Sequence, residues 1–306
     1  MHYSVLLTEA IDALSIKNDG VYVDATVGYG GHSEEILKRT KRGFLFAFDA
    51  DEEAIKFSNK RLSEISSNFK IIHSNFSNMK ECLNSLSITS VDGIVFDLGV
   101  SSPQIDNAER GFSFMKDAIL DMRMDKTSGL TAKDVVNSYT YEELINIFFK
   151  YGEEKLSKVI AKRIVNEREK KEISTTKELV SIISDAVGKK YFSLHHPERQ
   201  IFQAIRIEVN KELSSIEKAI PDAINLLKKG GRLAVITFHS LEDRIVKQIF
   251  NKYSQVDEMV RGLPEIPDEY KPLIKLINKK PIVASKDELE KNSRSKSAKL
   301  RIVERI

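Results

Sequence analysis

Short runs of apolar residues alternate with helical patterns along the first hundred residues of the chain. The apolar runs predict strands, whereas apolar residues recurring every three or four positions predict helices between them. Continuous apolar strands joined by helices are typical of a parallel sheet covered on both faces. The pattern therefore predicts an α/β fold. The predicted strands are 21–25, 44–48, 70–73 and 94–96, and the predicted helices between them include 33–39 and 54–65.

A long interruption separates the fourth predicted strand from the fifth. The fifth strand, 232–238, lies about 135 residues beyond Asp97, whereas a crossover with one helix needs only about 30 residues. The intervening sequence has helical patterns throughout. We therefore predict an inserted all-α domain at residues 106–196, within a discontinuous sheet domain formed by residues 1–105 and 197–306.

Helix capping signals mark several helix starts in the interruption and after it. Thr140 with Glu143 and Thr175 with Glu178 have the spacing of capping boxes. The remaining predicted elements are a helix over 200–227 with a break at Pro221, a helix over 241–253 capped by Ser240 with Asp243, and two edge strands at 281–285 and 299–306.

Composition excludes several classes of protein. The 306 residues are 41% hydrophobic and 30% charged, as in an ordinary globular protein. No apolar run approaches the roughly 18–20 residues that span a bilayer, and the N-terminus has no targeting pattern, so we expect a cytoplasmic protein without membrane contact. Cys82 is the single cysteine, which excludes an internal disulfide and a cysteine-rich metal site.

Positive charge is concentrated near the C-terminus. The net charge is only +3, but residues 271–306 contain 11 Lys/Arg and 4 Asp/Glu, so their local charge is 11 − 4 = +7. A basic segment on a near-neutral body favours a polyanionic partner. A solvated lysine-rich surface accounts for the same charge, so nucleic acid remains open on charge alone.

A glycine-rich turn follows the first predicted strand. Gly28, Gly30 and Gly31 allow the backbone to approach a ligand closely at a helix N-terminus. The third glycine of the dinucleotide fingerprint is replaced by Ser33, which counts weakly against NAD. Asp49 follows Gly28 by 21 residues and closes the second strand, where a carboxylate accepts hydrogen bonds from ribose hydroxyls. Both NAD and S-adenosylmethionine contain a ribose that such a carboxylate can bind.

Three segments in the middle of the chain are more specific. The sequence DLGVSSPQ spans Asp97–Gln104, ERGFSF spans Glu109–Phe114 and LDMRMD spans Leu120–Asp125. Together with further blocks along the chain, they closely resemble the MraW/RsmH family of bacterial small-subunit rRNA cytosine-N4-methyltransferases. The resemblance implies a class I S-adenosylmethionine-dependent methyltransferase fold, Rossmann-like, with a seven-stranded mostly parallel sheet and an inserted helical domain. The further blocks begin at His2, Asp24, Ser74, Phe202, Gly230 and Arg294.

The resemblance also implies a cofactor site for S-adenosylmethionine. The matching residues place the methionine end of the cofactor at Gly30, Gly31 and His32, the ribose at Asp49 and the adenine beside Phe76, with Asp97 and Gln104 completing the site. Two of these residues also suit a purely structural role, because Phe76 is typical of a core position and His32 of a helix start.

The implied reaction is methyl transfer to the N4 amino group of a cytosine in the decoding region of 16S rRNA, with the small ribosomal subunit as partner. Such a displacement from a sulfonium needs no metal. We expect Asp97 to be the catalytic residue, which either accepts a hydrogen bond from the substrate amine or orients the methionine amino group. The sequence leaves both roles open, and it leaves a homodimer open.

Further residues are candidate substrate contacts. Ser101 and Ser102 are candidates for hydrogen bonds to the base, although a turn before Pro103 accounts for them equally well. Arg123, Arg206 and Asn210 are hypothetical RNA contacts, and an ion pair of Arg123 with Asp121 or Asp125 is the alternative. His239 lies at the mouth of the fifth strand.

Three other functions remain to be separated by experiment. An NAD-dependent oxidoreductase shares the glycine turn and Asp49, but it does not account for the helical insertion. A non-catalytic RNA-binding protein would retain the fold without transferring a methyl group. An enzyme of organellar rRNA would need a transit segment, and the sequence has no such pattern.

Overall fold

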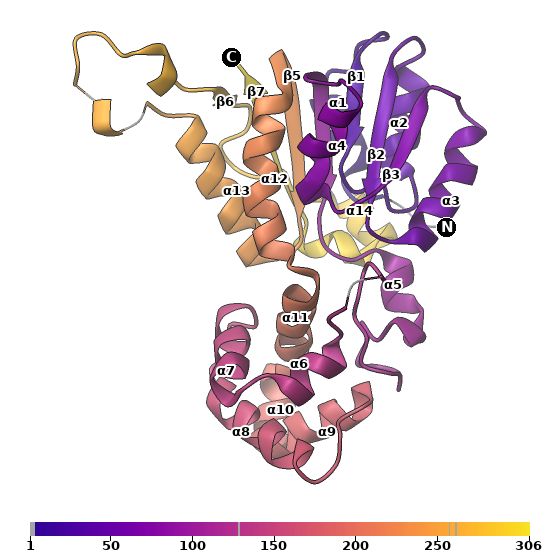
Figure 1. Cartoon of the computed structure of the whole chain (residues 1–306), viewed down its shortest axis with the longest axis vertical. Coiled ribbons are helices and arrows are strands. Elements are labelled where there is room, and N and C mark those ends of the chain that lie inside the picture. The colour runs from indigo at the N-terminus through magenta and orange to yellow at the C-terminus, as the bar shows by residue number, and fades with distance from the viewer. Residues whose placement is uncertain (1–3, 128, 257, 261) are drawn as a thin grey trace. The chain divides into compact units, whose positions relative to one another are not determined.

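All strands in the described part of the chain belong to one sheet (Figure 1). The computed structural model describes residues 4–127, 129–256, 258–260 and 262–306. The strand order is β3-β2-β1-β4-β5-β7-β6, with parallel pairing from β3 to β5 and with β7 antiparallel to both of its neighbours. The strands are β1 Val21–Asp24, β2 Phe44–Asp49, β3 Phe69–His73, β4 Val91–Asp97, β5 Leu227–Thr237, β6 Ile274–Leu276 and β7 Lys299–Arg305.

Helices cover both faces of the sheet because successive side chains of each strand point to opposite faces. In β1, Tyr22 belongs to the core beneath α1, α2 and α3, and Val23 to the core beneath α4, α12 and α13. Both cores are lined mainly by aliphatic and aromatic side chains. The covering helices are α1 Leu7–Ala13, α2 Gly31–Arg39, α3 Glu52–Ser63, α4 Met79–Ser85, α12 Glu212–Leu226 and α13 Ser240–Tyr253.

The order of the strands defines a switch point between β1 and β4. From β1 the chain continues to β2 and β3 on one side, and it later returns to β4 on the other side. In such sheets ligands bind outside the carboxyl ends of the strands at the switch point. Asp24 ends β1 and Asp97 ends β4, so two carboxylates lie at this position.

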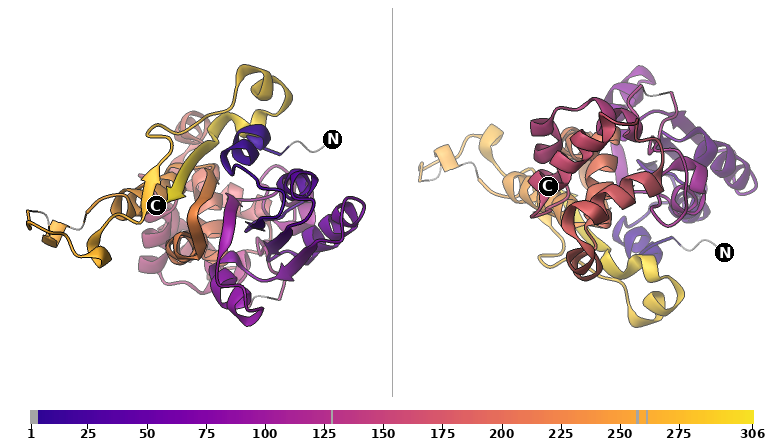
Figure 2. Two further views of the ribbon diagram at one scale, coloured as in Figure 1. Left: turned by 90° about the horizontal axis from the view of Figure 1, so that it is seen from above. Right: turned by 90° about the horizontal axis from the view of Figure 1, so that it is seen from below.

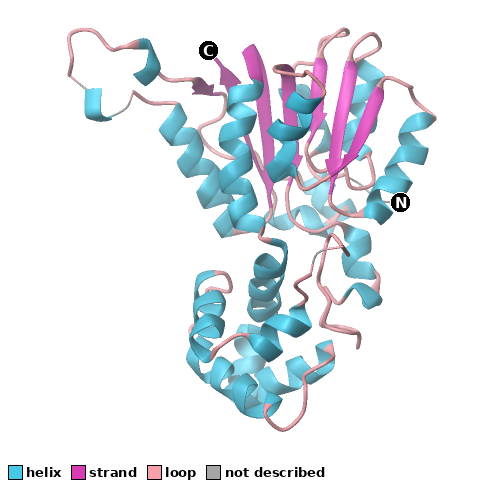
Figure 3. Ribbon diagram, in the orientation of Figure 1, coloured by secondary structure: helices cyan, strands magenta, loops and turns pink. Residues whose placement is uncertain are grey.

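Residues 100–212 form a second compact unit, which contains helices and loops (Figure 3). The capping boxes predicted at Thr140 and Thr175 are confirmed at the starts of α7 and α9. Apolar faces of α6, α7, α8, α9 and α11 share one core. The helices are α5 Ser102–Asp106, α6 Ala132–Ser138, α7 Tyr141–Lys150, α8 Ser157–Arg168, α9 Thr176–Val187, α10 Lys189–His195 and α11 Pro197–Asn210.

The helical unit is longer than the predicted 106–196 because it also includes residues 100–105 at its start and α11 at its end. The prediction gave residues 197–212 to the sheet domain, but Ile201, Phe202 and Ile205 of α11 lie in the core of the helical unit. The helix predicted over 200–227 is interrupted, but not at Pro221 as predicted. Helix α11 ends before Lys211, which has a φ of 52°. Pro221, where the break was predicted, lies inside α12.

The C-terminal edge of the sheet also differs from the prediction. The strand predicted at 281–285 is reduced to one bridge between Ile282 and Leu300, and β6 pairs with β7 instead. A short helix, α14 Lys286–Lys291, and a 3-10 helix, Ser293–Ser297, precede β7. The other 3-10 helices are Phe76–Asn78, Ala108–Arg110, Glu258–Val260 and Asp268–Tyr270.

Within the described part of the chain, no helix combines the length and the apolar character that crossing a membrane requires.

Candidate cofactor site

The glycine turn between β1 and α2 has the backbone geometry that its sequence predicts. Gly28 and Gly30 have φ values of 48° and 79°, which residues with a Cβ atom rarely adopt. Gly30 is the N-cap of α2 and provides no side-chain cap. The first N–H groups of α2 are therefore suited to an anionic ligand group, which the helix dipole also favours.

Asp24 is a structural support of this turn. It is buried, its Oδ2 accepts a hydrogen bond from Ser33 Oγ at 2.7 Å, and its Oδ1 accepts one from the Thr26 N–H at 3.1 Å. Burial raises the pKa of the carboxyl group to about 6, although both hydrogen bonds oppose this shift. Asp24 thus joins the end of β1 to the first turn of α2.

Asp49 lies on the other side of the turn. Its Oδ2 accepts the N–H of Gly28 at 2.8 Å, and its Oδ1 accepts the N–H of Asp51 at 2.9 Å. Each carboxylate oxygen can accept a further hydrogen bond, as two neighbouring ribose hydroxyls require. Burial raises the pKa of Asp49 to about 6, so the carboxylate is the predominant form at neutral pH.

Asp97 has an acceptor atom that other described residues do not satisfy. Its Oδ1 is buried without a hydrogen-bond partner, and its Oδ2 lies 3.8 Å from His32 Nδ1. The side chain is 26% exposed. Burial, reinforced by the charges of Asp24, Glu242 and Glu288, raises the pKa of Asp97 well above its usual range. A buried acceptor without a partner is costly, so this carboxylate suits a ligand that donates N–H groups.

His32 is more than a residue at a helix start. It is buried in the first turn of α2, and its Nε2 lies 3.2 Å from the carbonyl oxygen of Val5. Because a carbonyl only accepts, Nε2 carries a proton in this contact. The ring is therefore oriented with Nδ1 toward Asp97, and the methionine end predicted at His32 would lie beside that carboxylate.

Phe76 lies directly beyond β3, at the start of a 3-10 helix. Its ring meets the ring of Phe96 edge-on, with centroids 5.6 Å apart and an interplanar angle of 84°. The side chain is partly buried against the sheet core. Phe76 therefore packs as a core residue while part of it remains accessible.

Ser101 and Gln104 form a capping box at the start of α5, in the helical unit. The Gln104 Oε1 accepts the N–H of Ser101 at 2.9 Å, and the Ser101 Oγ accepts the N–H of Gln104 at 3.4 Å. Ser102 is the first residue of this helix. The turn-stabilising alternative thus accounts for Ser101, and the same box orients the cofactor candidate Gln104.

The three hypothetical RNA contacts have partners within the helical unit. Arg123 pairs with Asp121 through two hydrogen bonds of 2.9 and 2.8 Å, which is the alternative that the sequence left open. Arg206 pairs in the same way with Glu212, at 2.8 and 2.9 Å.

Asn210, the third of these residues, binds the backbone of a loop. Its Oδ1 accepts the N–H of Met124 at 2.7 Å, and its Nδ2 donates to the carbonyl oxygens of Met122 and Arg206 at 2.8 and 2.9 Å. These bonds give Asn210 a structural role in the helical unit.

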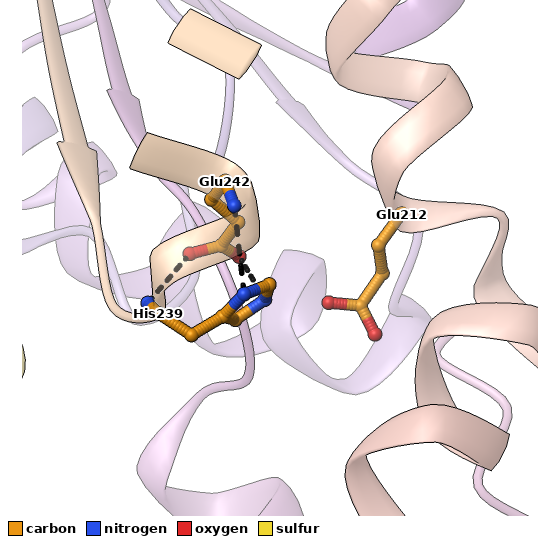
Figure 4. A group of neighbouring side chains, drawn as sticks. All are labelled: Glu212, His239 and Glu242. Carbon is orange, nitrogen blue, oxygen red and sulfur yellow. Dashed lines mark hydrogen bonds and ion pairs between the residues drawn. The ribbon is translucent and has the colours of Figure 1, made fainter. Parts of the chain in front are cut away.

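His239 is the N-cap of α13, a position that the sequence pattern gave to Ser240. The Glu242 carboxylate turns back toward it (Figure 4) and accepts the N–H groups of Phe238 at 2.7 Å and His239 at 3.2 Å. Asp243, the expected partner of Ser240, instead pairs with Arg301. The sequence prediction is wrong by one residue because histidine is not a usual N-cap.

The structure brings part of the predicted site together. Gly30, Gly31, His32, Asp49 and Asp97 surround the glycine turn at the carboxyl ends of the parallel strands, through the contacts described above. The remaining candidates, apart from Phe76 and His239, belong to the helical unit.

Sequence reasoning missed the supporting residues of the turn. Thr26 Oγ1 accepts the N–H of Asp97 at 2.6 Å, and Ser33 binds Asp24. The short polar residues between Asp24 and Ser33 were a signal that could have identified them.

Fold and site together define the class of the protein. The protein has the fold of a class I S-adenosylmethionine-dependent methyltransferase. Its sheet has the order 3-2-1-4-5-7-6 with an antiparallel β7, a glycine turn follows β1, and an acidic residue ends β2. The chain belongs to the MraW methylase family, whose sequence model matches residues 1–306. S-adenosylmethionine is therefore its methyl donor, and the turn and its carboxylates have the donor and acceptor groups that this cofactor requires.

Comparison with solved structures gives distant likenesses. An rRNA methylase from Streptococcus thermophilus is 13% identical over 100% of this chain and 99% of that chain, with a TM-score of 0.44. A putative methyltransferase from Streptococcus mutans in complex with S-adenosylhomocysteine is 12% identical over 100% of both chains, with a TM-score of 0.46. At this level of similarity, neither likeness assigns an activity to this chain.

Proposed function

We propose that this methyltransferase modifies the N4 amino group of a cytosine in the decoding region of 16S rRNA, within the small ribosomal subunit. The substrate is inferred from the motifs at Asp97–Gln104, Glu109–Phe114 and Leu120–Asp125. The observation that carries the chemistry is the buried, unpaired Oδ1 of Asp97. A cytoplasmic site of action follows from this substrate.

Bound S-adenosylmethionine supplies an electrophilic methyl group on a sulfonium. The chain must hold that methyl group in line with the attacking nitrogen, and such positioning contributes several kcal/mol. The N–H groups at the start of α2 bind the carboxylate of the methionine end, and Asp49 accepts hydrogen bonds from the ribose. Phe76 offers an aromatic surface to the adenine.

Asp97 accepts a hydrogen bond from an N–H group at the reacting end of the site. In one role it binds the cytosine amine, whose lone pair becomes available for attack as the nitrogen rehybridises. In the other it binds the methionine amino group and so orients the sulfonium. Both roles need the carboxylate as a hydrogen-bond acceptor.

The target base must leave its stack to reach such a site, which is easiest in splayed or single-stranded RNA. The experiment that tests the function is methylation of small-subunit particles from cells that lack the gene, with the product nucleoside identified by mass spectrometry. N4-methylcytidine in the decoding region is the expected product. A different nucleoside would refute the proposed target, and binding of RNA without methyl transfer would support a non-catalytic protein.

Replacing Asp97 separates its chemistry from the fold. We expect Asp97→Ala to lower the rate of methyl transfer by about 100-fold or more, the size of effect of one positioned catalytic group, while circular dichroism shows a folded protein. Asp19→Asn is the matched control because Asp19 is exposed before β1, at the amino end of the sheet. Turnover near that of the unmodified enzyme would remove Asp97 from the mechanism.

A further inference from the structure

The segment Ser4–Leu6 lies between the glycine turn and the C-terminal helix α14. The N–H of Leu6 donates to Glu288 Oε1 at 2.9 Å, and the carbonyl oxygen of Val5 faces His32 Nε2 at 3.2 Å. Views from above and below also show the C-terminal segment beside the N-terminal helix α1 (Figure 2). The first and last parts of the chain therefore meet at the start of α2.

Ser4 packs tightly against Gly31, the first residue of α2. A Cβ atom on Gly31 would lie 1.8 Å from Ser4 Oγ and 3.0 Å from Ser4 Cβ. The φ of Gly31 is not in the left-handed region, so the backbone alone would accept alanine there. A Cβ atom at this position would therefore force the Ser4 side chain to move.

The backbone of this segment is strained and needs support. Leu6 has φ 49° and ψ 36° and precedes α1 without a side-chain cap, a conformation that costs roughly 1–2 kcal/mol for a residue with a Cβ atom. Its side chain is buried in the core that also contains Val5 and Ile36 of α2. The carboxylate of Glu288 supplies the acceptor for the Leu6 N–H, and a charge-assisted bond of this kind is stronger than a neutral one.

We propose that Glu288 is a positioning residue of the cofactor site. By holding the Leu6 amide, it keeps the Val5 carbonyl against His32 and Ser4 against Gly31, and so sets the N-terminus of α2 before the cofactor binds. The C-terminal helix is thereby a functional part of the glycine turn, although 282 residues separate Leu6 from Glu288. This inference rests on the proposed placement of the cofactor at that turn.

Calorimetry with S-adenosylhomocysteine tests the role of Glu288. We expect Glu288→Ala to weaken binding by about tenfold, the loss expected for one hydrogen bond to a charged group. Glu288→Gln retains an Oε1 acceptor and should restore most of the affinity. Glu290→Ala is the matched control, since Glu290 is exposed on the same helix, and it should bind like the unmodified protein.

A second pair of variants tests the contact with Ser4. Gly31→Ala should weaken binding of S-adenosylhomocysteine, and adding Ser4→Gly should restore it because Ser4→Gly removes both crowding atoms. Failure of the double variant to recover, or equal affinity of Glu288→Ala and the unmodified protein, would overturn the inference. If the unmodified protein itself does not bind the ligand, the proposed cofactor site fails instead, so the two failures are distinguishable.

Discussion

The carboxyl groups of Asp24 and Asp49 beside the glycine turn are both buried, but they have different roles. Burial raises the pKa of both Asp24 and Asp49 to about 6. Asp24 binds a side-chain hydroxyl and a backbone N–H within the protein, so its charge supports the fold. Asp49 binds two backbone N–H groups and can accept further bonds from a ligand. Hydrogen bonds donated by ribose hydroxyls favour its ionised form.

This preference predicts a pH dependence of cofactor binding. Because the ligand favours ionised Asp49, affinity for S-adenosylhomocysteine should be low below pH 6, rise as the pH passes through about 6, and level off at neutral pH. The measurement is calorimetry between pH 5 and pH 8. Asp49→Asn should bind more weakly and lose the part of the pH dependence that Asp49 causes. An unchanged pH profile in that variant would contradict the assignment.

At the level of single elements, helix α13 shows how a cap can be built without a usual N-cap residue. The carboxylate of Glu242 satisfies the N–H groups of Phe238 and His239, while His239 Nδ1 accepts the N–H of Glu242 at 3.5 Å, a long contact. The acid therefore contributes more than the histidine to this helix start.

Stability measurements on α13 can separate these contributions. We expect Glu242→Ala to lower the free energy of unfolding by about 1–2 kcal/mol, because two partly buried N–H groups lose their acceptor. Ser240→Ala should change it by less than about 0.5 kcal/mol, as is usual for exposed positions, since Ser240 is exposed and already inside the helix. Urea unfolding measures both. A larger loss for Ser240→Ala would favour Ser240 as the cap after all.

Local patterns predicted the elements that depend on neighbours in the sequence. The parallel strands, the glycine turn and the caps at Thr140 and Thr175 follow from residues a few positions apart. The helix break at Lys211 did not follow, because lysine has no local preference for a positive φ. The apolar face of α11 was visible in the sequence, but periodicity does not show which core a face joins.

The same limit applies to the candidate site. Spacing along the chain identified Asp49 from Gly28, since the two lie on adjacent elements of one βαβ unit. The contact between Leu6 and Glu288 joins opposite ends of the chain, and neither residue type suggests it. Likewise, His239 has no local signal as a cap, and only the structure shows its place before α13.

At the scale of the whole chain, the positive charge of the C-terminal region divides into two groups. Lys275 pairs with Glu304, and Lys299 pairs with Asp243, so these lysines stabilise the sheet edge. The other group comprises exposed lysines that have no ion pair among the described residues. These are Lys279, Lys280, Lys286, Lys291 and Lys296.

If the substrate is RNA, the unpaired lysines near α14 should bind its phosphates. Lys291 ends α14, and Lys296 lies in the following 3-10 helix, which contacts α14. Each phosphate that a lysine neutralises releases counterions, so the logarithm of the affinity depends on the logarithm of the salt concentration with a slope of about −0.7 per contact on single strands. The double variant Lys291→Glu and Lys296→Glu should therefore bind rRNA more weakly and show a shallower salt dependence.

A matched control for this variant exists at the amino ends of the parallel strands. Lys41 and Lys229 are exposed near the starts of β2 and β5, so the double variant Lys41→Glu and Lys229→Glu changes the net charge by the same amount without altering the region of α14. Filter binding at several salt concentrations should give an unchanged slope for this control and a slope reduced by about 1 to 2 for the variant at Lys291 and Lys296. Equal losses in both double variants would mean that net charge, rather than phosphate contact at α14, attracts the RNA. Unchanged binding in the double variant would exclude Lys291 and Lys296 from the interface.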